Sequence, residues 1–196
     1  MNYKKSAKYL LDGVIVFFSL MSICILIRPA GLVVNSGISY YGNYIETLFP
    51  YAVAFLANSF LLWKASTIIG DKRKIDTYLG YALKIVAILM IGIMLTPYNA
   101  FNMTNLNLVH RTFGTAMFSV QMIMAVTIAT YAYRDWVNDL FLATAFLSGF
   151  AALIYMLQPT GFMIEAQIVF QISIWSIFIR YLNHVSNRTK KKIYNK

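Results

Sequence analysis

The stretch GVIVFFSLMSICILI, residues 13–27, runs for fifteen residues without a charge. It belongs to the first of six apolar segments, each long enough to cross the hydrocarbon core of a bilayer as a helix of about 20 residues. None of them alternates in polarity as the strands of a membrane barrel do. We therefore predict an all-α polytopic membrane protein, with residues 1–196 forming one domain built as a bundle of six transmembrane helices. The predicted spans are residues 8–28, 47–66, 78–97, 109–133, 137–158 and 162–182.

The first segment has one alternative interpretation, a cleaved secretory signal peptide. Its apolar run is at the upper length of a signal core. The sequence that follows, Arg28-Pro29-Ala30-Gly31, is a poor cleavage site because it does not present the usual pattern of small residues. We therefore expect an uncleaved first helix.

The composition agrees with a membrane protein. The chain is 59% hydrophobic and 12% charged, whereas soluble domains are roughly 45–50% apolar and roughly 25% charged. Of its 17 Lys and Arg residues, 15 fall in the two termini and the turns on their side, and only Arg28 and Arg111 fall on the other. Basic residues mark cytoplasmic loops, so we predict that both termini are cytoplasmic and that the protein resides in the cell membrane. The net charge of +10 follows from this topology, and we expect no nucleic-acid partner.

Several classes of membrane protein are excluded because their characteristic residues are missing. The single cysteine, Cys24, rules out a disulfide framework, and two histidines leave little for a haem pair. The chain has no phosphate-binding loop of an ATPase and no helix with regularly spaced arginines. Metal binding by His110 with Glu46 and Glu165 fits by ligand type alone. We predict no cofactor and no metal.

Ionisable residues gather at the predicted outer ends of the helices. Charges near the hydrocarbon are costly, so such a group is a functional-site hypothesis by default. One interpretation is a site for a zwitterionic or anionic headgroup, and the other is a set of ion pairs that hold the helix ends in register. We expect Arg111 to pair with Glu165, which leaves Glu46 to Arg28. The candidate ligand-binding residues are Arg28, Glu46, His110, Arg111 and Glu165.

His110 is expected to point into the bundle. It shares one helix face with small and polar residues, namely Gly114, Gln121 and Ala125, and such faces usually pack against neighbouring helices. As a general base it would need a nucleophile within hydrogen-bond reach. The only plausible loop hydroxyls are those of Ser36, Ser39 and Thr104. No recognised nucleophile motif accompanies them, so we predict no catalytic residue.

The first outer loop, residues 29–46, is the longest connection in the chain. Long loops in compact domains are often functional or disordered. Gly37 and Gly42 permit turns that other residues resist, and the neighbouring tyrosines and isoleucines offer apolar anchors. We predict that the loop folds back over the helix ends as a cap containing Ser39, Tyr40, Tyr41 and Gly42.

Two short motifs carry a resemblance to a known family. The chain reads Gly37-Ile38-Ser39-Tyr40-Tyr41-Gly42 in the first outer loop and Thr47-Leu48-Phe49-Pro50-Tyr51 at the start of the second helix. It resembles the small six-span membrane proteins of domain of unknown function 998 and, more distantly, the damage-regulated autophagy modulators. The matching positions are Ser39 and Gly42 of a Ser-x-x-Gly element, and His110 near the outer end of the fourth helix. The resemblance implies a six-span fold in a membrane and no particular reaction.

The sequence leaves three functions open. The first is a non-enzymatic protein that binds a lipid or small amphiphile near the outer leaflet, or that serves as a subunit of a membrane assembly. The second is a small transporter or permease component with an outer-facing polar site, which needs a path past Gln121 or Gln171. The third is an intramembrane hydrolase or transferase acting on lipids, which needs a nucleophile or metal beside His110. The expected partners are membrane lipids and either a partner membrane protein or a second copy of the chain.

Overall fold

Six long helices make up most of the computed structural model, which describes residues 2–33, 37–69, 73–96, 98, 105–157 and 162–194. All six are long and apolar enough to span a membrane, and the described ranges contain no strand. The predicted all-α bundle of six membrane-spanning helices is therefore confirmed. The helices are α1 (Tyr3–Ile27), α2 (Ile45–Ile68), α3 (Lys74–Leu95), α4 (Asn105–Thr127), α5 (Trp136–Leu157) and α6 (Met163–Tyr194). Shorter elements are the 3-10 helices η1 (Pro29–Val33) and η2 (Gly37–Asn43), and the π-helical turn η3 (Ile128–Ala132) that extends α4.

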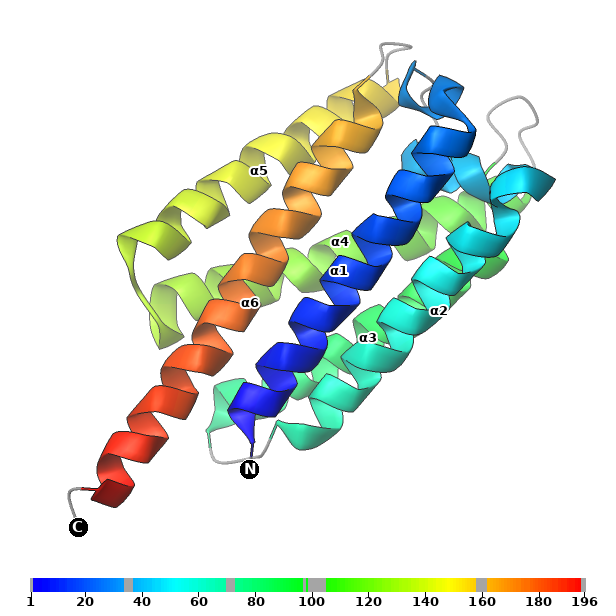
Figure 1. The fold of residues 1–196 in the computed structure, drawn as a ribbon. Helices are drawn as coiled ribbons and strands as arrows, with labels where there is room; N and C mark the ends of the chain where they lie inside the picture. The colour runs from blue at the N-terminus through cyan, green and yellow to red at the C-terminus, as the bar shows by residue number, and fades with distance from the viewer. Residues whose placement is uncertain are drawn as a thin grey trace.

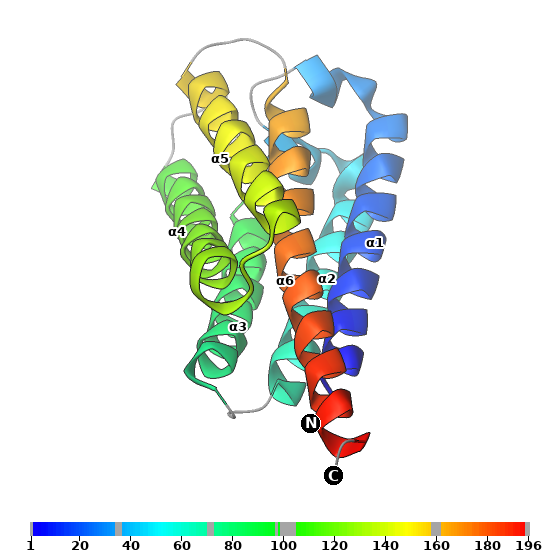
Figure 2. The same ribbon diagram turned by 90° about the vertical axis from the view of Figure 1, so that its left-hand side faces the viewer.

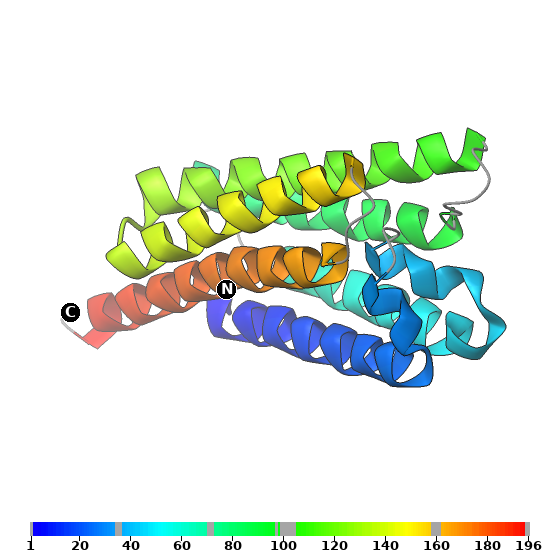
Figure 3. The same cartoon turned by 90° about the horizontal axis from the view of Figure 1, so that it is seen from above.

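The helices form a ring with one weak seam. Successive helices from α1 to α4 pack against each other, α5 packs against α6, and α6 returns to α1, whereas α4 and α5 make few contacts. Figure 2 shows α4 and α5 side by side on one face of the bundle, and Figure 3 shows α6 between α5 and α1. Both termini lie at one end of the bundle (Figure 1), which we call the terminal end. The opposite end, which carries η1 and η2, is the distal end.

The helix ends follow from local chemistry. Before α1, the side chain of Asn2 accepts a hydrogen bond from the backbone N–H of Lys5 at 3.0 Å, which satisfies one of the unpaired donors of the first turn. The helix ends at Ile27, with Arg28 as its C-cap, because Pro29 has no N–H with which to continue the ladder. At the end of α3, the hydroxyl of Thr96 donates to the carbonyl of Gly92 at 2.7 Å.

Helices α1, α2, α3 and α6 are longer than the predicted spans, above all α6. It continues to Tyr194, whereas the predicted span ends at Leu182. Hydropathy reports only the part of a helix that lies in the hydrocarbon. The polar residues after Leu182 extend the same helix beyond that part.

At the terminal end, a buried carboxylate joins three helices. Asp76 of α3 is fully buried and accepts hydrogen bonds from the phenols of Tyr3 at 2.8 Å and Tyr181 at 2.6 Å. Arg73 donates to both carboxylate oxygens, at 3.1 and 3.0 Å. A buried charge is tolerated when it is paired and hydrogen-bonded in this way. This network fixes α1, α3 and α6 relative to one another.

Candidate ligand-binding site

The first loop lies over the distal end as η1 and η2. Tyr40 and Tyr41 are buried there, and all four predicted cap residues, Ser39 to Gly42, belong to η2. Gly37 begins η2 with φ +59°, a left-handed conformation in which a side chain is strained. The part of the loop at residues 34–36, including the candidate nucleophile Ser36, lies outside the described residues, as does Thr104.

Two hydrogen bonds attach η2 to the helices. The backbone N–H of Ile38 donates to Oε1 of Gln167 on α6 at 2.9 Å. The hydroxyl of Thr47 on α2 donates to the carbonyl of Tyr41 at 2.7 Å. Burial raises the pKa of the Tyr41 phenol to about 12, with smaller contributions from nearby negative charge that include Glu165. The cap is therefore held from two sides of the bundle and keeps Tyr41 neutral.

The expected pair between Arg28 and Glu46 is present, but it is loose and exposed. The closest guanidinium and carboxylate atoms are 3.8 Å apart. Arg28 also donates through Nε to the phenol of Tyr40 at 3.0 Å, and its guanidinium carbon lies 3.4 Å from the centre of the Tyr44 ring. Exposed ion pairs contribute about 0–1 kcal/mol, so Arg28 acts mainly by packing the cap against the end of α1.

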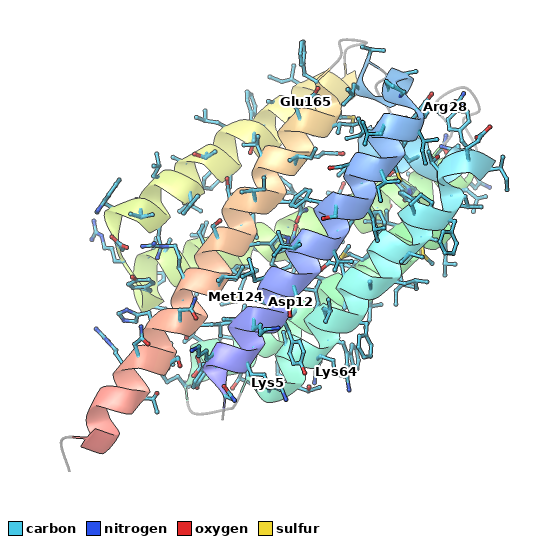
Figure 4. The ribbon with its side chains drawn as sticks, in the orientation of Figure 1. Lys5, Asp12, Arg28, Lys64, Met124 and Glu165 are labelled. Atoms are coloured by element: carbon cyan, nitrogen blue, oxygen red, sulfur yellow. The ribbon has the colours of Figure 1, made fainter. Side chains whose placement is uncertain are left out.

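The prediction that Arg111 and Glu165 form an ion pair is wrong. No ion pair joins the two side chains, although both are described. Arg111 instead donates through Nη2 to the phenol of Tyr98 at 2.6 Å. Oε2 of Glu165, at the distal start of α6 (Figure 4), is buried without a hydrogen-bond partner, as is Nε of Arg111. Since α4 and α6 make few contacts with each other, their ends do not bring these charges together.

His110 is buried, as its helix face predicts, and hydrogen-bonded through both ring nitrogens. Its Nε2 lies 2.7 Å from the hydroxyl oxygen of Ser39. Its Nδ1 contacts the backbone carbonyl oxygen of Thr96 at the end of α3. Of the three loop hydroxyls that the sequence leaves open, the structure thus places Ser39 beside the imidazole.

A cavity of about 590 Å³ extends from this group into the bundle. Its distal part is lined by polar side chains, including Ser39, His110, Arg111 and Gln167. Farther from the distal end the lining is mainly aromatic and aliphatic, including Phe17, Phe55, Met122, Phe170 and Trp175, with the polar residues Asn58, Ser119 and Gln171 among them. The volume lies within the range of about 300–1,000 Å³ typical of ligand pockets.

Helix α6 contributes one continuous face to this cavity. Met163, Gln167, Gln171 and Trp175 are spaced by four residues and all line it, as expected for one side of a helix. The side-chain amides of Gln171 and Gln121 exchange two hydrogen bonds, at 3.0 and 3.2 Å. Sequence analysis missed this face as a unit, although its four-residue spacing is a signal that could have revealed it.

The weak seam between α4 and α5 borders the cavity. Several lining residues on these two helices are exposed. The ring of Phe118 stacks on Phe170 of α6, with centroids 4.6 Å apart, and a Cβ on Gly149 of α5 would lie 2.6 Å from Phe118. The exposed lining residues are Thr115, Phe118 and Ser119 of α4, and Phe146, Phe150 and Leu153 of α5.

Toward the terminal end the cavity stops. Met122 and Trp175 are the lining residues farthest along α4 and α6 from the distal end. Beyond them the bundle is filled by large side chains that are fully buried, including Leu10, Leu62, Leu83, Ile128 and Phe178. This cavity is therefore confined to the distal half.

The predicted five-residue cluster is divided among separate environments. Arg28 and Glu46 lie beside the cap tyrosines, His110 and Arg111 line the cavity, and Glu165 is not among the lining residues. Within the described ranges, no three His, Cys, Asp or Glu side chains are grouped so that they could hold a metal ion. The site is thus better defined by the cavity than by the five charged residues.

Comparison of the chain with protein-family models, with curated proteins and with solved structures finds no match in any of the three. The resemblance to domain of unknown function 998 stays a prediction.

Proposed function

We propose that this multi-pass membrane protein binds one lipid or small amphiphile in the distal cavity. The headgroup lies beside Ser39, His110 and Arg111, and the hydrocarbon chain extends toward Trp175. The observation that carries the proposal is the change in polarity along one cavity, from polar residues at the cap to mainly aromatic and aliphatic residues in the middle of the bundle. An amphiphile has the same order of polar and apolar parts.

Access from the bilayer supports a lipid over a water-soluble ligand. The seam between α4 and α5 places exposed residues on the cavity wall, and these residues are mostly apolar. In a membrane this surface faces acyl chains. A lipid can therefore reach the cavity sideways without passing through water.

The closed terminal half favours binding over transport. A permease needs a path that continues past Gln121 and Gln171 to the other side of the membrane. Here the side-chain amides of Gln121 and Gln171 are hydrogen-bonded to each other. Large buried side chains fill the bundle beyond them. The geometry therefore supports a binding protein better than a channel-like or alternating-access path.

The distribution of Lys and Arg orients the protein in the membrane. Positively charged residues mark the cytoplasmic side of a membrane protein, and 15 of the 17 Lys and Arg residues belong to the side of the termini. We place the terminal end in the cytoplasm and the distal end on the outer side of the cell membrane. The bound headgroup then lies at the level of the outer leaflet.

Trp175 offers a direct test, since it is 3% exposed and lines the cavity. The other two tryptophans are replaced, Trp63→Phe and Trp136→Phe, so that Trp175 alone fluoresces. The protein is reconstituted in phosphatidylcholine that carries a dibrominated acyl chain, which quenches only tryptophans in close contact. We expect strong quenching of Trp175 by a chain inside the cavity.

A filled cavity provides the control. A Cβ on Gly114 meets no atom within 4 Å, and Gly114 lines the cavity, so Gly114→Leu places an isobutyl side chain in the space that the lipid chain would occupy. This variant should lose most of the quenching, whereas Ile123→Phe on the exposed face of α4 should keep it. Quenching that is weak in the parent, or equal in parent and Gly114→Leu, contradicts the proposal.

A further inference from the structure

We propose that Ser39 and His110 form a nucleophile and general base that remove an acyl group from an ester-linked amphiphile held in the distal cavity. This inference rests on the proposed binding function and adds a reaction to it. It starts from the 2.7 Å contact between the Ser39 hydroxyl and Nε2 of His110. Both residues line the cavity.

The partners of His110 fix the direction of this hydrogen bond. The carbonyl oxygen of Thr96 can only accept, so Nδ1 of His110, which contacts it, carries the hydrogen. In the neutral imidazole Nε2 then has a lone pair, and Ser39 must be the donor. A serine that donates to an imidazole whose other nitrogen is held by an acceptor has the arrangement needed to activate a nucleophile.

The backbone around Ser39 holds the hydroxyl in place. Ile38, which directly precedes Ser39, donates its backbone N–H to Oε1 of Gln167. The carbonyl of Ser39 itself accepts from Nδ2 of Asn43 at 3.2 Å. Asn43 also donates to the carbonyl of Tyr98 at 2.5 Å, so the cap is tied to the segment that follows α3. Such support favours catalysis because it reduces the reorganisation needed to reach a reactive geometry.

Arg111 supplies the positive charge that the reaction requires. It follows His110 in the chain, lines the same cavity, and directs Nη2 to Tyr98. Its Nε is buried without a hydrogen-bond partner, so the protein leaves one donor of this guanidinium unused. Fixed donors directed at a developing oxyanion often make the largest contribution to catalysis of acyl transfer.

The reaction balances with water as the only co-reactant. Oγ of Ser39 forms a bond to the ester carbonyl carbon while His110 takes the hydroxyl proton, and the carbonyl oxygen becomes an oxyanion near Arg111. The tetrahedral intermediate breaks its bond to the leaving oxygen, which receives the proton from His110, and the acyl group stays on Ser39. Water, deprotonated by His110, then releases the acid and restores Ser39.

The substrate class follows from the position of the dyad. An acyl ester has its carbonyl where the headgroup meets the hydrocarbon chain. Ser39 and His110 belong to the polar, distal part of the cavity lining, and the aromatic and aliphatic residues lie farther from the cap. A bound ester-linked lipid therefore places its carbonyl at the level of the dyad while its chain fills the apolar part.

Covalent labelling with an alkyl fluorophosphonate tests the inference, because an activated serine displaces fluoride from phosphorus and retains the probe. We expect labelling of the reconstituted protein at Ser39, located by mass spectrometry of its peptides. Ser39→Ala should abolish it, and His110→Gln should slow it by about 10²–10⁴-fold, the usual contribution of a general base. Ser22→Ala, which removes an exposed hydroxyl that bonds only the carbonyl of Phe18 in its own helix, lies outside the cavity lining and should leave the rate unchanged.

Quenching of Trp175 by brominated lipid separates this inference from the proposed function. Trp175 of Ser39→Ala should still be quenched, because the substitution leaves the aromatic and aliphatic lining around Trp175 unchanged. Such quenching would show that the variant folds and admits lipid while the reaction is lost. A parent that is quenched but never labelled, or labelled equally after Ser39→Ala, overturns the acyl-transfer inference and leaves binding intact. Labelling at Ser39 without quenching of Trp175 supports the nucleophile and contradicts the bound lipid.

Discussion

Tyr181 of α6 donates its phenol hydrogen to Asp76 of α3 over 2.6 Å, although 105 residues separate them in the chain. Asp76 is the acceptor for Tyr3 of α1 as well. The terminal half of the bundle is thus braced by one carboxylate, while the distal half contains the cavity. Hydrogen bonds to Asp76 therefore join the helices in the half of the bundle that lies opposite the cavity.

Loss of one hydrogen bond to Asp76 should measurably destabilise the bundle. Hydrogen bonds to a charged group contribute about 1.5–3 kcal/mol, so we expect Tyr181→Phe to lower the free energy of unfolding by about that amount. Denaturation by SDS in mixed micelles measures it. Tyr78→Phe, at a tyrosine that is 59% exposed, is the matched control and should change little. Equal stability of the two variants would show that the network does not brace the helices.

The start of η2 requires glycine. In Gly37→Ala the left-handed backbone costs about 1–2 kcal/mol, and the new Cβ lies 2.6 Å from Oε1 of Gln167. We expect a lower midpoint of thermal unfolding in detergent. Gly114→Ala is the control, because its Cβ meets nothing within 4 Å and alanine favours a helix by roughly 0.5–1 kcal/mol. A harmless Gly37→Ala would refute this account of the cap.

Alkaline pH should weaken the cap through Tyr41. Burial raises the pKa of its phenol to about 12 from the ordinary value of 10.0, so the folded state holds this proton more tightly than the unfolded state. Its contribution to stability is complete below pH 10 and is lost as the pH rises from about 10 to 12. We expect Tyr41→Phe to reduce the loss of thermal stability between pH 9 and pH 11.5, roughly the same window. An alkaline profile identical to that of the parent would contradict a buried neutral phenol.

Cysteine labelling tests the orientation. Val33, in η1, is 75% exposed, and the native Cys24 is fully buried. We expect Val33→Cys to react with a membrane-impermeant maleimide in intact cells. Lys4→Cys, at the terminal end, should react only after the cells are permeabilised. The reverse pattern would place the cavity on the cytoplasmic side.

The spans were predictable because hydropathy is a local property of the chain. The pair of Arg28 and Glu46 was predictable too, since the loop between α1 and α2 joins their helix ends and the two helices pack together. The pair of Arg111 and Glu165 was not, since it assumes that α4 and α6 meet at the distal end. That order around the ring depends on side-chain packing, which no single segment reveals.

The Ser39–His110 pair and the hydrogen bonds to Asp76 were not predictable from the sequence for the same reason. The sequence named His110 and three hydroxyls, but the choice of Ser39 depends on how η2 folds over α4. The network around Asp76 was not predicted, because its partners Tyr3 and Tyr181 lie 73 and 105 residues away in the chain. Contacts at such separations follow from the arrangement of the helices, which cannot be predicted from a single sequence.

The seam between α4 and α5 has a consequence for selectivity. A lipid that moves through it leaves one hydrocarbon medium for another, so burial of its chain yields little of the free energy that drives apolar ligands out of water. Occupancy then depends on the mole fraction of that lipid in the leaflet rather than on an aqueous concentration. Preference for one lipid over the surrounding excess of others must come from the few polar contacts around His110 and Arg111.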